Sequence, residues 1–272
     1  MKKLKFLIIP LIMSLVVLAG CAPKGEENVK TEANKTVEET KKPEEAKKPE
    51  EVKKPVEEKV DAEVLNRFDK YFYKGEDELI YIGMAEYGFM AKYDKEDVKD
   101  AKEKVVVYEG AMRDGMGEPE GKGPREFTVS YTVDKDKIVE KIDNRDYVKN
   151  KKTILNSIIE NFVVVKGEVK VGNKWEQGFK IEDKEYKAVT EIKSLDKKGD
   201  KDEFVVESTV KDIKGYKDNT YVERRTYREG LGLIMLEYRP TMVNGQEPMD
   251  DFIGYSLNYL KDKDGNVNVI ER

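Results

Sequence analysis

The chain has 272 residues, with 51 Lys and Arg against 56 Asp and Glu, and a formal net charge of −5. It contains one Cys and no His, which excludes an intramolecular disulfide, a Ser-His-Asp or Cys-His nucleophile and the commonest zinc ligand. Its mildly acidic balance of mixed charges lacks the basic footprint of a nucleic-acid-binding protein, so we predict no nucleic-acid partner.

The first residues have the pattern of a secretory signal. Lys2, Lys3 and Lys5 precede an apolar segment over 6–17. An uncleaved N-terminal membrane helix is the alternative, but such a helix needs about 20 apolar residues.

The segment ends in Leu18-Ala19-Gly20-Cys21, which resembles the lipobox of bacterial lipoprotein signal peptides. The resemblance implies cleavage between Gly20 and Cys21 and transfer of a diacylglyceryl group to the sulfur of Cys21. Two acyl chains anchor a protein stably, whereas one does so only marginally. We therefore expect residues 1–20 to be a signal peptide, and the mature chain to be held by lipid on the outer face of the cytoplasmic membrane.

Residues 21–60 are predicted to form a disordered tether. They contain no aromatic residue, and 41–46, 47–52 and 53–58 are near-repeats that each begin Lys-Lys-Pro. Such a polar segment buries too little apolar area to offset its ordering entropy, and its prolines prevent a continuous helix. We interpret it as a spacer; a Pro-rich docking site is the alternative.

Residues 61–272 are predicted to form a β-rich globular domain. Helical periodicity appears at 61–68 and 153–162, a Gly- and Pro-rich loop at 113–124 and a charged turn at 196–202. The domain is therefore predicted to be mainly β, or α+β, as an antiparallel sandwich or open barrel with one or two short helices. The predicted strands are 79–82, 87–93, 104–108, 126–133, 137–142, 163–165, 178–181, 185–195, 203–210, 220–228, 233–238, 254–260 and 266–270.

The apolar run 231–236 predicts a central strand. Strand side chains alternate between faces, so Leu233 and Ile234 should point in opposite directions and both be buried.

Two short motifs, 170–175 (Lys-Val-Gly-Asn-Lys-Trp) and 226–234 (Thr-Tyr-Arg-Glu-Gly-Leu-Gly-Leu-Ile), together with Tyr71-Phe72, resemble a group of uncharacterised surface lipoproteins from Gram-positive bacteria. The resemblance implies a β-rich extracytoplasmic domain and no catalytic residues. We interpret Gly172, Trp175, Gly230 and Gly232 as structural. The glycines suit backbone conformations closed to other residues, and Trp175 fits the core better than a ligand site.

No motif predicts a catalytic residue, a metal site or a cofactor. Residues 261–267 fail the spacing of a calcium loop and are predicted to be a hairpin turn, and 110–123 lacks the ending of a phosphate-binding loop. Three carboxylates, Glu247, Asp250 and Asp251, cluster near a turn and are the basis for considering acid–base hydrolysis.

These features predict a non-enzymatic, membrane-anchored module that binds an envelope protein, a cell-wall component or a small ligand. Two alternatives stay open. An envelope hydrolase would show paired carboxylates of raised pKa in a cleft, and a carrier of an apolar ligand would show a large apolar cavity.

Overall fold

The computed structural model describes residues 67–83, 88–100, 102–113, 125–144, 157–241 and 251–271. Within these ranges the structure is predominantly β, and the helices are two three-residue 3-10 turns, η1 (Asp69–Tyr71) and η3 (Lys217–Asn219). No helix in the described part of the chain is long and apolar enough to cross a membrane. The strands are β1 (Glu78–Ile82), β2 (Gly88–Asp100), β3 (Glu103–Arg113), β4 (Arg125–Asp134), β5 (Lys137–Asn144), β6 (Val163–Lys166), β7 (Lys174–Ile181), β8 (Lys184–Lys198), β9 (Lys201–Val210), β10 (Tyr221–Arg228), β11 (Gly232–Tyr238), β12 (Ile253–Lys261) and β13 (Val267–Val269).

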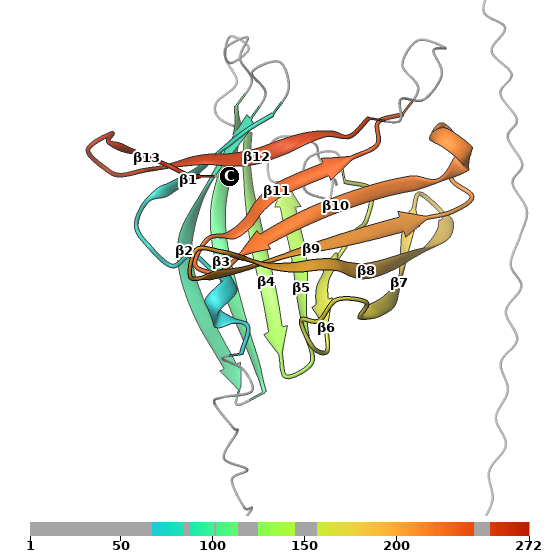
Figure 1. Cartoon of the computed structure of the whole chain (residues 1–272), viewed down its shortest axis with the longest axis horizontal. Helices are drawn as coiled ribbons and strands as arrows, with labels where there is room; N and C mark the ends of the chain where they lie inside the picture. The colour runs from blue at the N-terminus through green and yellow to red at the C-terminus, as the bar shows by residue number, and fades with distance from the viewer. Residues whose placement is uncertain are drawn as a thin grey trace, which may run out of the picture. The chain divides into compact units, whose positions relative to one another are not determined.

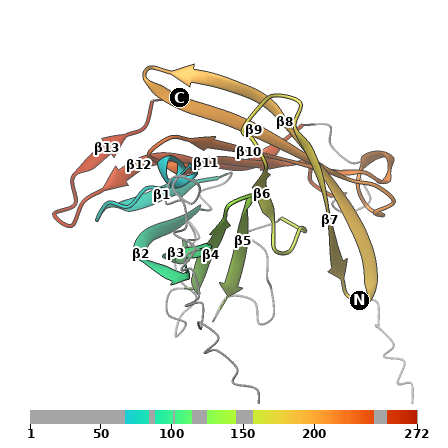
Figure 2. The same cartoon turned by 90° about the horizontal axis from the view of Figure 1, so that it is seen from below.

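All thirteen strands belong to one antiparallel sheet, in the order β6-β5-β4-β3-β2-β1-β12-β11-β10-β9-β8-β7, with β13 paired to β12. The first and last parts of the domain are joined where β1 pairs with β12, with Leu79 opposite Leu260. The strands β8–β12 pass across β2–β5, and the side chains between these two walls form the core (Figures 1 and 2). The predicted mainly β, antiparallel fold is confirmed. Of the two predicted architectures, a sandwich and an open barrel, the domain adopts the open barrel.

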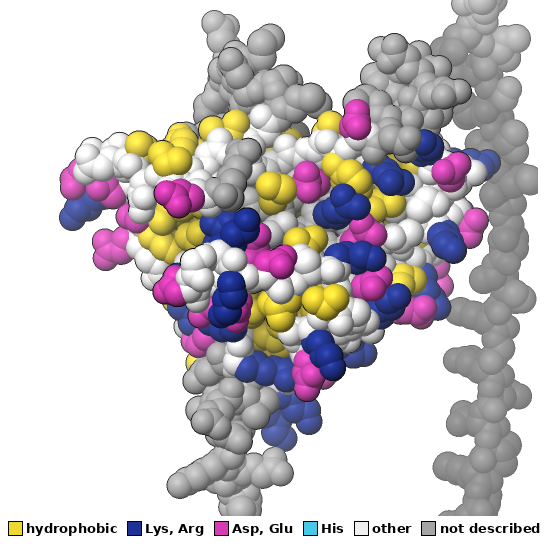
Figure 3. Space-filling model, in the orientation of Figure 1, with side chains coloured by type: hydrophobic (Ala, Val, Ile, Leu, Met, Phe, Trp, Pro, Cys, Tyr) yellow, Lys and Arg dark blue, Asp and Glu magenta, His cyan; other side chains and the backbone are white. Residues whose placement is uncertain are grey.

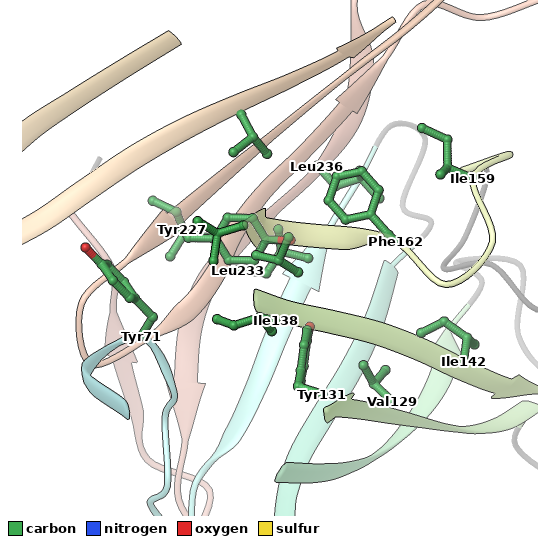
Figure 4. Packing of buried hydrophobic residues seen from close by; sticks show 14 of the residues in the cluster. Tyr71, Val129, Tyr131, Ile138, Ile142, Ile159, Phe162, Tyr227, Leu233 and Leu236 are labelled. Carbon is green, nitrogen blue, oxygen red and sulfur yellow. The ribbon is translucent and has the colours of Figure 1, made fainter. Parts of the chain in front are cut away.

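Strand alternation decides which side chains enter the core. On β4 the buried residues are Phe127, Val129, Tyr131 and Val133, which alternate along the strand and so share one face. Val129 and Tyr131 lie near Ile138 of β5 in the core (Figure 4).

The prediction of a central strand over 231–236 is also confirmed. Strand β11 pairs with β10 on one side and β12 on the other. Leu233 and Ile234 are only 5% and 8% exposed.

The helix predicted over 153–162 does not form in its described part. Residues 157–159 have no regular structure, and 160–161 form a turn in which Asn161 has a φ of 48°. Ser157, Ile159 and Phe162 are each buried, although they do not lie on a helix. Tertiary packing therefore overrides the helical periodicity. Residues 153–156 lie outside the described residues. Of the other predicted helix, 61–68, residues 61–66 also lie outside them, and Arg67 and Phe68 form a turn before η1.

The charged turn predicted at 196–202 is shorter than expected. Strand β8 continues to Lys198 and β9 begins at Lys201. Gly199 has a φ of 65°, and its tolerance of that conformation lets the hairpin close in two residues.

Candidate functional site

The most unusual feature of the interior is a buried cluster of three charges. Arg225 of β10 donates from Nε to Glu223 of the same strand at 2.6 Å and from Nη1 to Glu140 of β5 at 2.7 Å. The side chains of these three residues are at most 2% exposed. The salt bridge to Glu140 therefore connects the two walls of the barrel through its core.

Neutral side chains satisfy the remaining polar atoms of this cluster. Tyr131 donates to Glu140 at 3.1 Å, Tyr221 donates to Glu223, and Arg225 Nη2 donates to Ser157 at 3.3 Å. The guanidinium also lies 3.6 Å from the ring centroid of Phe162. Each carboxylate thus accepts from the arginine and from one phenol, which is the pairing a buried ion needs.

The cluster fixes the ionisation of its members. Burial raises the pKa values of Tyr131 and Tyr221 well above their usual range, and the adjacent glutamates raise them further. Burial alone would lower the pKa of Arg225, but Glu140 and Glu223 outweigh it and hold the guanidinium charged. The tyrosines are therefore neutral donors and the arginine is a fixed cation.

This arrangement favours a structural role over catalysis. Glu140 and Glu223 are paired carboxylates, but both are buried and both are bonded to Arg225. A hydrolytic acid–base pair must reach its substrate. These two face the core.

Beside the cluster lies an interior cavity of about 40 Å³. Ligand sites typically measure about 300–1,000 Å³, so the core has room only for very small molecules. The cavity is lined by Tyr71, Phe72, Leu79, Tyr81, Phe89, Ala91, Tyr108, Val129, Tyr131, Ile138, Val164, Phe204, Tyr227, Leu231, Gly232 and Leu233. Several of these side chains are shown in Figure 4.

The seam between the end strands β6 and β7 is closed by side chains of the 170–175 motif and the residues after it. Trp175 Nε1 donates to the carbonyl of Val163 at 3.1 Å, and Gln177 Oε1 accepts from the N–H of Val163 at 2.7 Å. Asn173 Nδ2 donates to the carbonyl of Lys166 at 2.7 Å. Positions 173, 175 and 177 alternate along the chain, so one face of the segment satisfies the β6 edge in place of a backbone ladder.

Gly172 and Trp175, predicted to be structural, both belong to this seam. Gly172 has a φ of 83°, and its N–H donates to the carbonyl of Ile192 on β8 at 2.9 Å. Trp175 is 5% exposed. The glycine thus turns the chain so that Trp175 enters β7 facing the core.

Gly230 and Gly232 of the second motif hold the short helix η1. Gly230, with a φ of 77°, donates its N–H to the carbonyl of Lys70 at 2.6 Å. A Cβ on Gly232 would lie 3.2 Å from the carbonyl oxygen of Tyr71. The structure therefore brings the Tyr71-Phe72 segment and the 226–234 motif together, while Gly172 and Trp175 lie at the seam.

Two open hollows flank the loop 167–173. One, of about 360 Å³, is lined by Arg67, Phe68, Lys70, Tyr71, Gly167, Glu168, Val169, Leu195 and Asp202. The other, of about 450 Å³, is lined by Glu168, Lys170, Val171, Gly172 and Asn173. Val171 of the loop is 54% exposed and Leu195 of β8 is 39% exposed, so the hollows present apolar side chains to solvent between charged ones.

Two of the charges that line the first hollow, Lys70 and Asp202, are paired with each other. Lys70 contacts Asp202 and lies 3.6 Å from Glu229, and Arg67 donates to the carbonyl of Gly167 at 3.2 Å. The face of the molecule in Figure 3 likewise intersperses positive, negative and hydrophobic side chains. This surface is suited to mixed polar and apolar contacts rather than to steering by a field of one sign.

Several predicted site residues lie outside the described residues: Gly20, Cys21, Glu247 and Asp250. Asp251 is described and exposed. The predicted turn at 261–267 is a hairpin joining β12 and β13, in which the carboxylate of Asp262 accepts from the backbone N–H groups of Asp264 and Asn266. No group of metal-ligating side chains occurs among the described residues.

Sequence reasoning missed the buried charges, although strand alternation could have found them. Glu140 stands between Ile138 and Ile142 at a spacing of two, so it shares their inward face. Glu223 and Arg225 likewise alternate between Tyr221 and Tyr227.

Comparisons with known proteins add a distant structural neighbour. No family model matches the chain, and a search of curated proteins finds no match. The crystal structure of a "putative lipoprotein" from Parabacteroides distasonis ATCC 8503 aligns with a TM-score of 0.38 and 10% sequence identity, covering 71% of this chain and 97% of that one.

Proposed function

We propose that this chain is a lipid-anchored extracytoplasmic protein of a Gram-positive envelope, with Cys21 as the lipidated residue. The observation that carries the proposal is the tetrapeptide ending in the only Cys, directly after a basic and then apolar segment. Anchoring by two acyl chains holds the mature chain at the outer face of the cytoplasmic membrane. Residues 21–60 then serve as a spacer between the anchor and the β-rich domain.

The β-rich domain acts as a non-enzymatic binding module that uses its outer surface. Support comes from the interior, where the cavity is about 40 Å³ and the paired carboxylates are buried against Arg225. The open hollows beside the loop 167–173, of about 360 and 450 Å³, fall within the size range of ligand sites. The partner is an envelope protein, a cell-wall component or a small ligand that contacts this loop.

Site-specific photo-cross-linking in intact cells tests the binding surface. A photoreactive residue replaces Val171, which is 54% exposed at the hollow, and a matched one replaces Val267, which is 58% exposed on β13. We expect adducts from position 171 and few from 267. Equal adducts from both positions, or none from 171, would contradict the assignment of this surface.

A further inference from the structure

Tyr227 carries a polar atom that the protein leaves unsatisfied. The side chain is 3% exposed, and no protein group accepts the proton of its hydroxyl. Burial raises the pKa of this phenol, and the nearby Arg225 lowers it. A guanidinium carries donors only, so Arg225 cannot accept the phenol proton. A buried donor without a partner costs about 1–3 kcal/mol, so each such group in a native fold requires an explanation.

The surroundings of Tyr227 supply acceptors for a bridging molecule. Tyr227, Tyr81 and Tyr131 all line the interior cavity. Tyr81 donates its own proton to the carbonyl of Leu233 at 2.6 Å, and Tyr131 donates to Glu140. Both phenol oxygens therefore keep lone pairs that can accept.

The size of the cavity selects the ligand. Its volume is about 40 Å³, whereas a single water needs roughly 10–15 Å³. A purely apolar cavity stays dry, and one of about 150 Å³ is needed for a benzene-sized guest. This cavity is too small for such a guest and has a phenol donor and two phenol acceptors in its wall.

We propose that the interior cavity is a binding site for ordered water, which accepts a hydrogen bond from Tyr227 and donates to the hydroxyl oxygens of Tyr81 and Tyr131. Water there continues the polar network of Arg225, Glu140 and Glu223 into the aromatic part of the core. It also satisfies Tyr227 without a protein partner.

Magnetic relaxation dispersion of water nuclei, measured on the full chain in detergent, counts long-lived internal waters. We expect Tyr227→Phe to lose about one to three waters relative to wild type, given the room in the cavity. The matched control Tyr186→Phe alters a tyrosine that packs on Phe179, away from the cavity lining, and should keep the wild-type count. An unchanged count in Tyr227→Phe would overturn the proposal.

A second variant and a second probe guard against a failure of Tyr227→Phe to fold. Ala91 lines the cavity, so Ala91→Val narrows it while keeping all three phenols and should also remove the water. Xenon, which enters dry apolar cavities, should bind neither wild type nor Ala91→Val. Xenon binding to the wild-type interior would show a dry cavity and contradict the proposal.

Discussion

Arg225 on β10 and Glu140 on β5 meet inside the core, with Nη1 and Oε1 2.7 Å apart and both side chains at most 2% exposed. The strands that carry them lie far apart in the order of the sheet. This salt bridge therefore spans the interior and complements the pairing of β1 with β12. A buried pair of this kind costs desolvation, but removing one member costs more because the other is left uncompensated.

Arg225→Met should therefore destabilise the domain strongly. The change leaves Glu140 and Glu223 buried without their cation, and breaking a buried pair typically costs about 3–5 kcal/mol. Chemical denaturation followed by circular dichroism measures the loss. The control is Lys187→Met, which removes an exposed salt bridge to Glu176 and should cost about 0–1 kcal/mol. Equal effects of the two changes would show that the buried cluster does not support the fold.

Gln177→Ala tests the seam. Its side chain accepts from the N–H of Val163 at 2.7 Å and donates to the carbonyls of Glu160 and Asn161 at 3.2 and 3.3 Å. These hydrogen bonds are part-buried, and a typical hydrogen bond contributes about 0.5–1.5 kcal/mol, so the change should cost about 1 kcal/mol or somewhat more. Amide hydrogen exchange should also become faster in β6 than in the other strands of the sheet. Glu176→Ala, on the opposite face of β7, is the matched control. Equally fast exchange in β6 of this control variant would contradict the role of Gln177 in closing the seam.

The strands were predictable because their signals are local. Alternating apolar residues locate β4, and the continuous apolar run 231–236 locates β11. The order of the sheet was not predictable, since β1 and β12 pair across most of the domain and no local pattern encodes that contact. The helix predicted at 153–162 failed for the same reason: Gln177 and the core hold 157–162 in an irregular path.

The candidate site was only partly predictable. Gly172, Trp175, Gly230 and Gly232 were identifiable from their residue types, but the contacts that explain them, with β8, Val163 and η1, join distant segments. The buried charges were not identified from the sequence, because 39% of the chain is charged and most charged residues are exposed. Nothing in their residue types distinguishes Glu140, Glu223 and Arg225 from exposed charges.

Leu233→Ala and Ile234→Ala should both be costly, because adjacent residues of a central strand are buried on opposite faces. Truncation of a buried Leu or Ile to Ala typically costs about 2–5 kcal/mol. Thr128→Ala, on the outward face of β4, should cost clearly less. Denaturation midpoints compare the three. A silent change at either 233 or 234 would mean that one face of β11 is exposed to solvent.

High pH should unfold the domain before its interior tyrosines ionise. Burial raises the pKa of Tyr216 to about 12, and the pKa values of Tyr81, Tyr108 and Tyr227 are raised further. Below about pH 10 these phenols are protonated in both states and contribute no pH dependence. Above it the unfolded chain releases protons that the folded chain retains, so the free energy of unfolding falls as pH rises.

Tyrosinate absorbance and circular dichroism, recorded together, measure that transition. Exposed tyrosines should titrate near pH 10, and the interior ones should follow only as the β signal is lost. Titration of all 15 tyrosines in one step near pH 10 with the β signal intact would contradict the burial of these phenols.

The proposed anchor is tested most directly by mass spectrometry of the N-terminus of the protein purified from bacterial membranes. We expect a mature chain that begins at Cys21, with the mass of a diacylglyceryl group on its sulfur. A Cys21→Ala variant should lack this group and either keep residues 1–20 or be released from the membrane. A wild-type peptide that runs unbroken through Gly20 and Cys21 with a free thiol would contradict it.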